Sequence, residues 1–139
     1  MIMALDVGSK RIGIAIAQGG TNLAIPLATI QRVNRRHDLA QLQGYFESYA
    51  VEELVVGDPI ALSGERGVAA RAMDPFVAEL RRIFGGPVHR VDERMTTAQA
   101  TKTLIASDVS RRKRREIVDA MAAALILESF LARRRNESA

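Results

Sequence analysis

The fold is decided by the first residues of the chain, MIMALDVGSKRIGIAIA at positions 1–17. Two apolar runs, 1–7 and 12–17, flank a turn at Gly8 and do not alternate with polar residues. Runs of this kind are typical of strands that are buried on both faces of a sheet. Asp6 is the exception, because a carboxylate near the end of such a strand is costly to bury unless something positive compensates it. The segment therefore predicts a β-hairpin with an acidic group at the end of its first strand.

The rest of the chain adds a third strand and then alternates helices with strands. The apolar spacing predicts strands at 23–30, 53–57 and 88–93, and helices at 38–49, 68–84, 96–107 and 111–133. This order predicts a mixed five-stranded α/β sheet in which the first three strands form an antiparallel meander and helices flank the sheet. We expect one domain over residues 1–139, with a flexible tail at about 134–139.

Length and composition exclude several classes of protein. The chain has 139 residues, 47% of them hydrophobic, which is enough for one domain with a single core. It has no cysteine, which excludes disulfide cross-links, thiolate metal sites and a cysteine nucleophile. Its apolar runs are far shorter than the ~18 residues of a membrane span, and its start lacks the features of a signal peptide. We therefore expect a soluble cytoplasmic protein with no membrane association.

The excess positive charge is concentrated near the carboxyl end. Residues 1–110 contain 12 basic and 12 acidic groups, whereas residues 111–139 contain 8 basic and 4 acidic groups, which accounts for the net charge of +4. Arginine supplies 17 of the 20 cations, and its planar guanidinium group suits phosphate. Nucleic acid is therefore the leading class of partner, and a solvated arginine-rich surface is the alternative. Aromatic residues make up only 4% of the chain, so we expect no surface on which bases stack.

Carboxylates at the ends of predicted core elements are the candidate catalytic residues. Asp6 either binds a metal ion or closes the Gly8 turn by accepting hydrogen bonds from backbone amides. Asp92 and Glu93 end another apolar strand and point to opposite faces, so only one of them can join Asp6 directly. Glu93 is preferred because its longer side chain can reach across the strand ends. Asp92 is the second candidate, unless it caps the following turn.

Asp119 is the most informative of these acids, because it lies on the packing face of a predicted helix. Its face carries Arg115 and Glu116 one turn earlier, and Ala122 and Ala123 one turn later. Those alanines allow the helix to approach the sheet closely, so Asp119 would lie at the start of the surface that packs against the sheet. An ion pair with Arg115 is the structural alternative to a catalytic role.

The three carboxylates together indicate a metal site. Groups of carboxylates in a chain without cysteine favour hard cations such as Mg²⁺ or Mn²⁺. Two such ions, held by Asp6, Glu93 and Asp119, would support hydrolysis of a phosphodiester bond by activating a water molecule and stabilising the attacking and leaving oxygens. Metal binding would also relieve repulsion among the acids and so stabilise the fold. The pattern therefore predicts a metal-dependent nuclease.

A run of cations begins the last predicted helix and contains Arg111, Arg112, Lys113, Arg114 and Arg115. The helix dipole disfavours cations in the first turn, so an anionic partner explains the run better than local stability does. The run lies one or two turns before Asp119, so phosphates bound there would lie near the proposed metal ions. The same predicted nucleic-acid-binding surface includes Lys10, Arg11, Arg94 and Ser110. A solvated arginine-rich corner is the alternative.

Three segments that carry these residues resemble a known family. They are ALDVGSKRIGIA at 4–15, VDERMTT at 91–97, and VSRRKR at 109–114 followed by VDAMAA at 118–123. In this order they closely resemble the YqgF/RuvX family across almost the whole chain. That family has an RNase H-like fold related to the RuvC Holliday junction resolvases, and it is associated with maturation of the 5′ end of 16S ribosomal RNA.

The resemblance assigns the same acids to the active site. The family's first-strand aspartate corresponds to Asp6, and its helix aspartate to Asp119. Its Asp-Glu-Arg carboxylate corresponds to Glu93, with Asp92 beside it. The match is looser at Asp58, where the family usually has an apolar residue. Asp58 ends a predicted strand, so it is either an additional metal ligand or a turn cap.

The resemblance implies a nuclease that processes the 5′ end of pre-16S ribosomal RNA. A resolvase for Holliday junctions or other branched DNA is the close alternative, because the chemistry is identical and no residue pattern reads a 2′-hydroxyl. A non-catalytic nucleic-acid-binding module, with structural carboxylates, is the alternative of another class. A resolvase would need two symmetric active sites and hence a homodimer, whereas a monomer suffices for a single RNA end.

Overall fold

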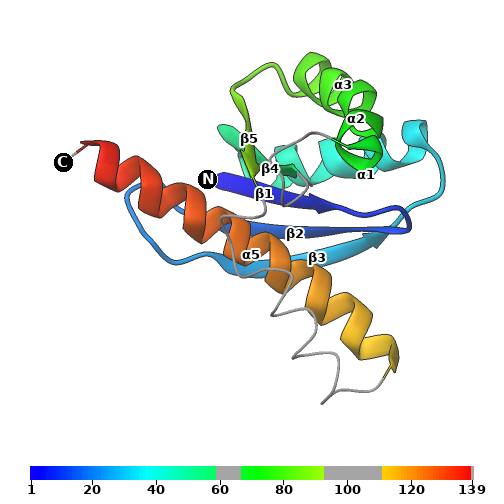
Figure 1. Ribbon diagram of the computed structural model, residues 1–139, viewed down its shortest axis with the longest axis horizontal. Coiled ribbons are helices and arrows are strands. Elements are labelled where there is room, and N and C mark those ends of the chain that lie inside the picture. Colours follow the sequence, from blue (N-terminus) through cyan, green and yellow to red (C-terminus); the bar gives the residue numbers. More distant parts are fainter. Residues whose placement is uncertain (59–66, 93–110, 139) are drawn as a thin grey trace.

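A mixed five-stranded sheet forms the centre of the computed structural model, which describes residues 1–58, 67–92 and 111–138. The sheet has the order β3-β2-β1-β4-β5 (Figure 1). Its strands are β1 (Ile2–Val7), β2 (Arg11–Ala17), β3 (Ile25–Gln31), β4 (Glu53–Asp58) and β5 (Val88–Asp92). The described helices are α1 (Arg35–Ser48), α2 (Val68–Ala72), α3 (Asp74–Phe84) and α5 (Arg111–Ser138).

The strand directions confirm the predicted meander. Antiparallel pairing joins β1 to β2 and β2 to β3, whereas β4 runs parallel to β1 and β5 runs parallel to β4. The parallel pairs are connected through helices, as crossover connections require. In the β1–β2 pair, Asp6 is the register partner of Gly13. This pairing places the first predicted catalytic residue beside a position without a side chain.

The two faces of the sheet carry separate apolar clusters. Helices α1 and α3 cover one face, and α5 lies across the other (Figure 1). Side chains alternate along each strand, so Met3 and Leu5 of β1 pack beneath α1 and α3. Ile2 and Ala4 face α5 instead. The same alternation continues to Asp6, which therefore lies on the α5 face.

Small residues bring α5 close to the sheet. The cluster on this face contains the buried alanines Ala4, Ala15, Ala17, Ala123 and Ala124. Gly13 allows a closer approach, because a Cβ atom at this position would overlap the backbone carbonyl group of Asp119. Ala122 and Ala123 are fully buried, so the predicted stripe of small residues after Asp119 is indeed a packing face of α5.

Two helix boundaries before α5 differ from the prediction. Helix α1 begins at Arg35, three residues earlier than predicted, because the Asn34 side chain accepts a hydrogen bond from the His37 amide and caps the helix. The single helix predicted over 68–84 is interrupted at Met73, just before Pro75, which has no N–H to continue the helical hydrogen bonds. The helix predicted over 96–107 lies outside the described residues.

Helix α5 extends five residues beyond its predicted end at 133 and stops at Ser138. Its last turns are held to the sheet by Arg134, whose two terminal nitrogens donate to the two carboxylate oxygens of Glu53 at 2.8 and 2.6 Å. His89 contacts the same carboxylate at 2.8 Å, and its ring lies against Phe130. The helix therefore continues into the segment from about 134 onward that we expected to be a flexible tail.

The anchor at Glu53 gives a pH-dependent prediction. Hydrogen bonds from Arg134 first, and then from His89, lower the pKa of Glu53 to about 2, although burial opposes them. A lowered carboxylate pKa contributes stability above the ordinary pKa of the group, and this contribution disappears as the pH falls toward 2. We expect Glu53→Gln to lower the free energy of unfolding by roughly 1–2 kcal/mol at neutral pH.

Urea titrations of wild type and Glu53→Gln across pH measure this difference directly. The difference in the free energy of unfolding between the two proteins should decrease steadily below pH 4.5, which is the ordinary pKa of a glutamate carboxyl group. Glu52→Gln is the matched control, since its exposed side chain has no ion pair within the described residues. If this difference stays constant down to acid pH, the Glu53 carboxylate does not hold the end of α5 to the sheet.

None of the helices in the described parts of the chain is long and apolar enough to cross a membrane.

Candidate active site at the end of the first strand

Asp6 is a buried carboxylate at the carboxyl end of β1. Only 5% of the residue is exposed, and the residues before it on the same face pack against α5. Burial of an ionised carboxylate is costly unless its charge is compensated. This cost makes Asp6 the first candidate for a functional residue on this face.

Asp119 is brought to Asp6 by the contact between α5 and Gly13. The Asp119 backbone lies directly against Gly13, where a side chain would not fit. Gly13 is in turn the register partner of Asp6 on the neighbouring strand. All three residues lie on the α5 face of the sheet, so the backbones of Asp6 and Asp119 both lie beside Gly13 although they are far apart in the sequence.

Arg11 forms an ion pair with Asp119. Its Nε donates to the Asp119 Oδ2 at 2.7 Å, and both side chains are mostly buried. The sequence assigned Arg11 to nucleic-acid binding, and the structure shows that it also pairs with Asp119. A charge-assisted hydrogen bond of this kind fixes the direction of the carboxylate. Arg115, which the sequence suggested as the partner of Asp119, is not among the side chains that the structure describes.

Backbone hydrogen bonds close the turn between β1 and β2. The Gly8 amide donates to the Arg11 carbonyl oxygen at 2.8 Å, and a Cβ atom at Gly8 would lie 3.0 Å from that oxygen. The Gly8 amide is therefore not available to the Asp6 side chain. The structural alternative, in which Asp6 closes the turn, would therefore need a backbone amide other than that of Gly8.

Two residues that the sequence analysis did not identify support this turn from the other side. The guanidinium of Arg32 donates to the Gly8 carbonyl oxygen at 2.9 Å and to Asp38 Oδ2 at 2.9 Å. Only 1% of Asp38 is exposed. Burial would raise the pKa of Asp38, but hydrogen bonds from the Val33 amide, Arg32 and His37 outweigh it and hold the pKa below its usual range. The only feature of the sequence that could have identified Asp38 was its position as an acid in the first turn of α1.

Asp58 and Asp92 lie on the opposite face of the sheet from Asp6. They are register partners at the ends of β4 and β5. Arg90 donates to Asp58 Oδ1 at 2.8 Å and to Asp74 Oδ1, at the start of α3, at 2.6 Å. Leu54 and Val56 of β4 pack beneath α1 and α3, so alternation places Asp58 on that same face. The structure does not bring these two acids to the Asp6 side chain.

The remaining predicted site residues are only partly described. Glu93, Arg94 and Ser110 lie outside the described residues. The cationic run 111–115 forms the first turns of α5, but its side chains are not among those described. Lys10 is exposed in the turn next to Arg11. Among the residues that are described, no group of three His, Asp or Glu side chains could hold a metal ion.

Comparison with known proteins places the chain among nucleases. A family model described as "RuvX: Holliday junction resolvase" matches residues 1–133. A protein of Moorella thermoacetica named "Putative pre-16S rRNA nuclease" is 45% identical over 132 residues, which cover 95% of this chain and 94% of that protein. A protein of Koribacter versatilis with the same name is 42% identical over 133 residues, covering 96% and 87% of the two chains.

Solved structures share the fold. The RuvC protein of Thermus thermophilus in complex with a Holliday junction substrate superimposes with a TM-score of 0.59 at 12% identity, over 94% of both chains. A second structure of the same RuvC gives a TM-score of 0.56 at 14% identity, over 94% of this chain and 95% of that one. The predicted RNase H-like fold is therefore confirmed.

Proposed function

This chain belongs to the RuvX family, and from that premise we propose that it is a metal-dependent nuclease that processes the 5′ end of pre-16S ribosomal RNA in the cytoplasm. The observation that supports the proposal is that Asp6 and Asp119 both lie beside Gly13, Asp6 on the neighbouring strand and Asp119 on the helix packed over it. Gly13 thus lets the helix that carries one candidate carboxylate approach the strand that carries the other.

The residues present fit Mg²⁺ or Mn²⁺. Carboxylate oxygens are the ligands that these hard cations prefer, and Asp6 and Asp119 lie on the same face of the sheet beside Gly13. In the proposal both would hold the metal together with Glu93, which the alternation argument favours because Asp92 lies on the other face. Bound divalent ions would supply an activated water molecule and positive charge beside the scissile phosphate.

The chain's own residues orient the site and bind the substrate backbone. Arg11 holds the Asp119 carboxylate, and Arg32 fixes the Gly8 carbonyl oxygen in the turn that follows Asp6. In the proposal the exposed Lys10 and the cations of 111–115 contact phosphates on either side of the scissile bond. Such contacts bind nucleic acid strongly but do not distinguish RNA from DNA.

The second candidate function is resolution of branched DNA, which the description of the family model favours. A resolvase must cut two symmetric strands and therefore needs paired active sites in a homodimer, whereas a monomer is sufficient for a single RNA end. Substrate preference and oligomeric state together distinguish the two functions.

A cleavage assay with three substrates tests the choice. Purified wild type is incubated with a precursor fragment that spans the 5′ end of 16S RNA, a four-way DNA junction and single-stranded DNA, each with Mg²⁺, Mn²⁺ or EDTA. We expect metal-dependent cutting of the RNA precursor near the mature end. Preferential cutting of the junction by a dimeric protein would replace RNA processing with resolution. Tight, salt-sensitive binding without any cutting would favour the non-catalytic module.

A further inference from the structure

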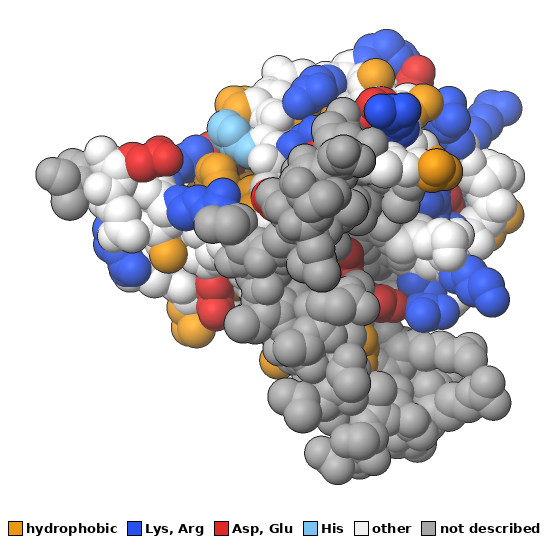
Figure 2. All heavy atoms as spheres, viewed as in Figure 1, with side chains coloured by type: hydrophobic (Ala, Val, Ile, Leu, Met, Phe, Trp, Pro, Cys, Tyr) orange, Lys and Arg blue, Asp and Glu red, His pale blue; other side chains and the backbone are white. Residues whose placement is uncertain are grey.

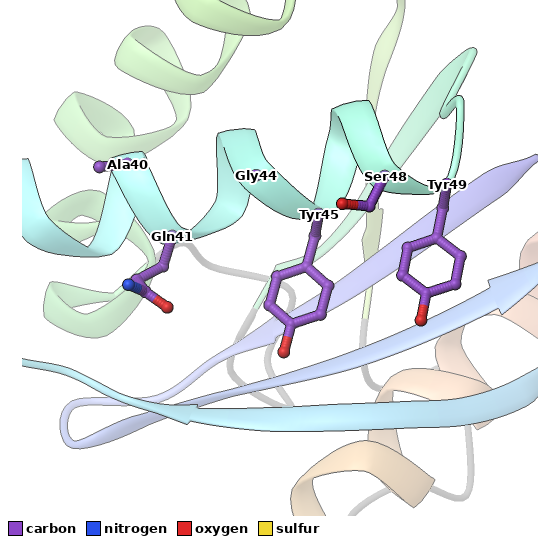
Figure 3. A pocket seen from close by; sticks show the side chains of 6 residues that line it. All are labelled: Ala40, Gln41, Gly44, Tyr45, Ser48 and Tyr49. Carbon is purple, nitrogen blue, oxygen red and sulfur yellow. The ribbon is translucent and has the colours of Figure 1, made fainter.

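The outer face of α1 carries an open hollow outside the proposed active site. The hollow has a volume of about 650 Å³ and is lined by α1 and its C-cap residue (Figure 3). We call its lining residues the α1 face: Ala40, Gln41, Gly44, Tyr45, Ser48 and Tyr49. The sheet separates this face from Asp6 and Asp119, which lie on the side that α5 covers.

Two aromatic rings give one side of the α1 face a fixed shape. The rings of Tyr45 and Tyr49 have centroids 6.3 Å apart and planes only 12° from parallel. Both side chains point the same way from the helix (Figure 3), and both pack partly against the apolar cluster beneath it. Neither ring is fully buried. A partner that covers them would lose little side-chain entropy, because their direction is already set.

Small side chains form the middle of the α1 face. Ala40, Gly44 and Ser48 follow one another at intervals of four residues, so they form a row along the helix. A Cβ atom at Gly44 would meet nothing within 4 Å, so packing within one copy does not require a glycine there. A helix is also less stable with an interior glycine than with alanine. The row allows the backbone of another helix to approach α1 closely.

Two unpaired charges flank the α1 face on one side. Arg36 and Glu47 are separated by about three helical turns, so they lie on the same side of α1 and near its opposite ends. Both are exposed, and neither has an ion-pair partner among the described residues. Acidic side chains lie among the Lys and Arg side chains over α1 and α3 in the space-filling view (Figure 2). The charges near this face therefore do not favour a uniformly anionic partner.

A second copy of α1 matches these charges when the two helices are antiparallel. In an antiparallel pair with two-fold symmetry, the same flank of both helices lies on one side of the contact, and each end of one helix meets the opposite end of the other. Arg36 and Glu47 are equally far from the middle of α1. With full overlap, Arg36 of each copy therefore lies opposite Glu47 of the other copy, and Ala40 and Gly44 lie near the crossing point.

The helix dipole favours the same arrangement. A cation in the first turn of α1 is unfavourable beside the positive end of its own helix. In the antiparallel pair, Arg36 would instead lie beside the negative end of the second helix, where a cation is favourable. A parallel pair would place both Arg36 residues at one end and both Glu47 residues at the other, so it would lose the attraction.

We propose that two copies of this chain associate through the α1 face as an antiparallel, two-fold symmetric helix pair. The 14 residues of α1 span about 21 Å, so a contact between two such helices is at the low end of interface sizes. We expect a reversible dimer with a dissociation constant of roughly 10–100 μM. Both candidate active sites stay open in this dimer, because they lie on the far side of each sheet. The inference therefore does not rest on the proposed function.

A larger side chain in the middle of the α1 face tests the contact. Gly44→Gln points into open space within one copy, so the fold should persist, and circular dichroism checks this. Sedimentation equilibrium, at concentrations on either side of the expected dissociation constant, should show an increase in that constant of about tenfold or more. Ala78→Gln is the matched control, because it enlarges an exposed side chain on α3. This control should dimerise as wild type does.

Reversal of the charges tests the orientation. In the symmetric pair, Arg36→Glu or Glu47→Arg turns two attractive contacts into repulsive ones, so each should raise the dissociation constant by about tenfold. Both changes suit the dipole of α1, so neither should unfold the helix. The protein with both changes has opposite charges across the contact again. It should dimerise as wild type does.

The outcomes decide the inference. A wild type that dimerises, is weakened by Gly44→Gln and recovers in the doubly reversed protein supports it. A wild type that stays monomeric at the highest soluble concentration overturns it. A dimer that Gly44→Gln leaves unchanged also overturns it, because the contact then lies elsewhere. A dimer that both single reversals weaken and the double reversal does not restore excludes the antiparallel arrangement.

Discussion

Among the described glycines, Gly13 is the one whose replacement by alanine is expected to destabilise the protein most. The added Cβ atom would overlap the Asp119 carbonyl group, and that group belongs to the backbone of a long helix that cannot give way locally. Helix α5 would have to move away from β2 and open the alanine-rich interface on this face of the sheet. We expect a loss of about 3 kcal/mol or more in the free energy of unfolding.

Urea denaturation followed by circular dichroism measures this loss. Gly19→Ala is the matched control, because a Cβ atom at Gly19 would meet nothing within 4 Å. It should change the stability by no more than about 0.5 kcal/mol. A Gly13→Ala protein with the denaturation midpoint of wild type would show that α5 does not approach the sheet at Asp119, and the proposed site would lose its geometric basis.

The substitution Asp6→Asn is expected to abolish most of the cleavage activity while the fold persists. It removes the negative charge of a proposed metal ligand but keeps the size and most of the hydrogen-bonding capacity of the side chain. Loss of one strong electrostatic contribution to a transition state typically lowers the rate by about a hundredfold to a thousandfold. Stability should be unchanged or higher, because an amide is less costly to bury than a carboxylate.

Initial rates of precursor RNA cleavage at saturating Mg²⁺ provide the measurement. Asp58→Asn is the matched control, since it makes the same chemical change on the opposite face, where the carboxylate pairs with Arg90. That variant should lose stability and keep its cleavage rate. The reverse result, with Asp58→Asn inactive and Asp6→Asn active, would place the catalytic centre on the face of the sheet that α1 and α3 cover.

The sequence predicted the parts of the fold that depend on local pattern. The meander followed from apolar runs separated by glycine turns, and the packing face of Asp119 followed from the alanines one turn later. Both depend on residues close together in the chain. The end of α5 was placed too early, because its last turns depend on the contact of Arg134 with Glu53, which is 81 residues away.

The contacts that complete the site were not predictable from local pattern. Arg11 and Asp119 are separated by 108 positions, and nothing near either one indicates the other. The face of the sheet on which the Asp58 side chain lies depends on the register of β4. Without that register, a side chain at the end of an apolar strand could lie on either face. An apolar side chain alone also does not mark the packing face of α5, since Ile117 is 42% exposed while the alanine side of the helix faces the sheet.

Calorimetric titration of the protein with Mn²⁺ tests the central claim most directly, namely that Asp6 and Asp119 together form a metal site. Wild type should bind Mn²⁺ and gain thermal stability that rises with the logarithm of the Mn²⁺ concentration above the dissociation constant, and Asp6→Asn and Asp119→Asn should each weaken binding by about tenfold or more. Asp58→Asn should titrate as wild type does. Equal Mn²⁺ affinity in wild type, Asp6→Asn and Asp119→Asn would contradict the account.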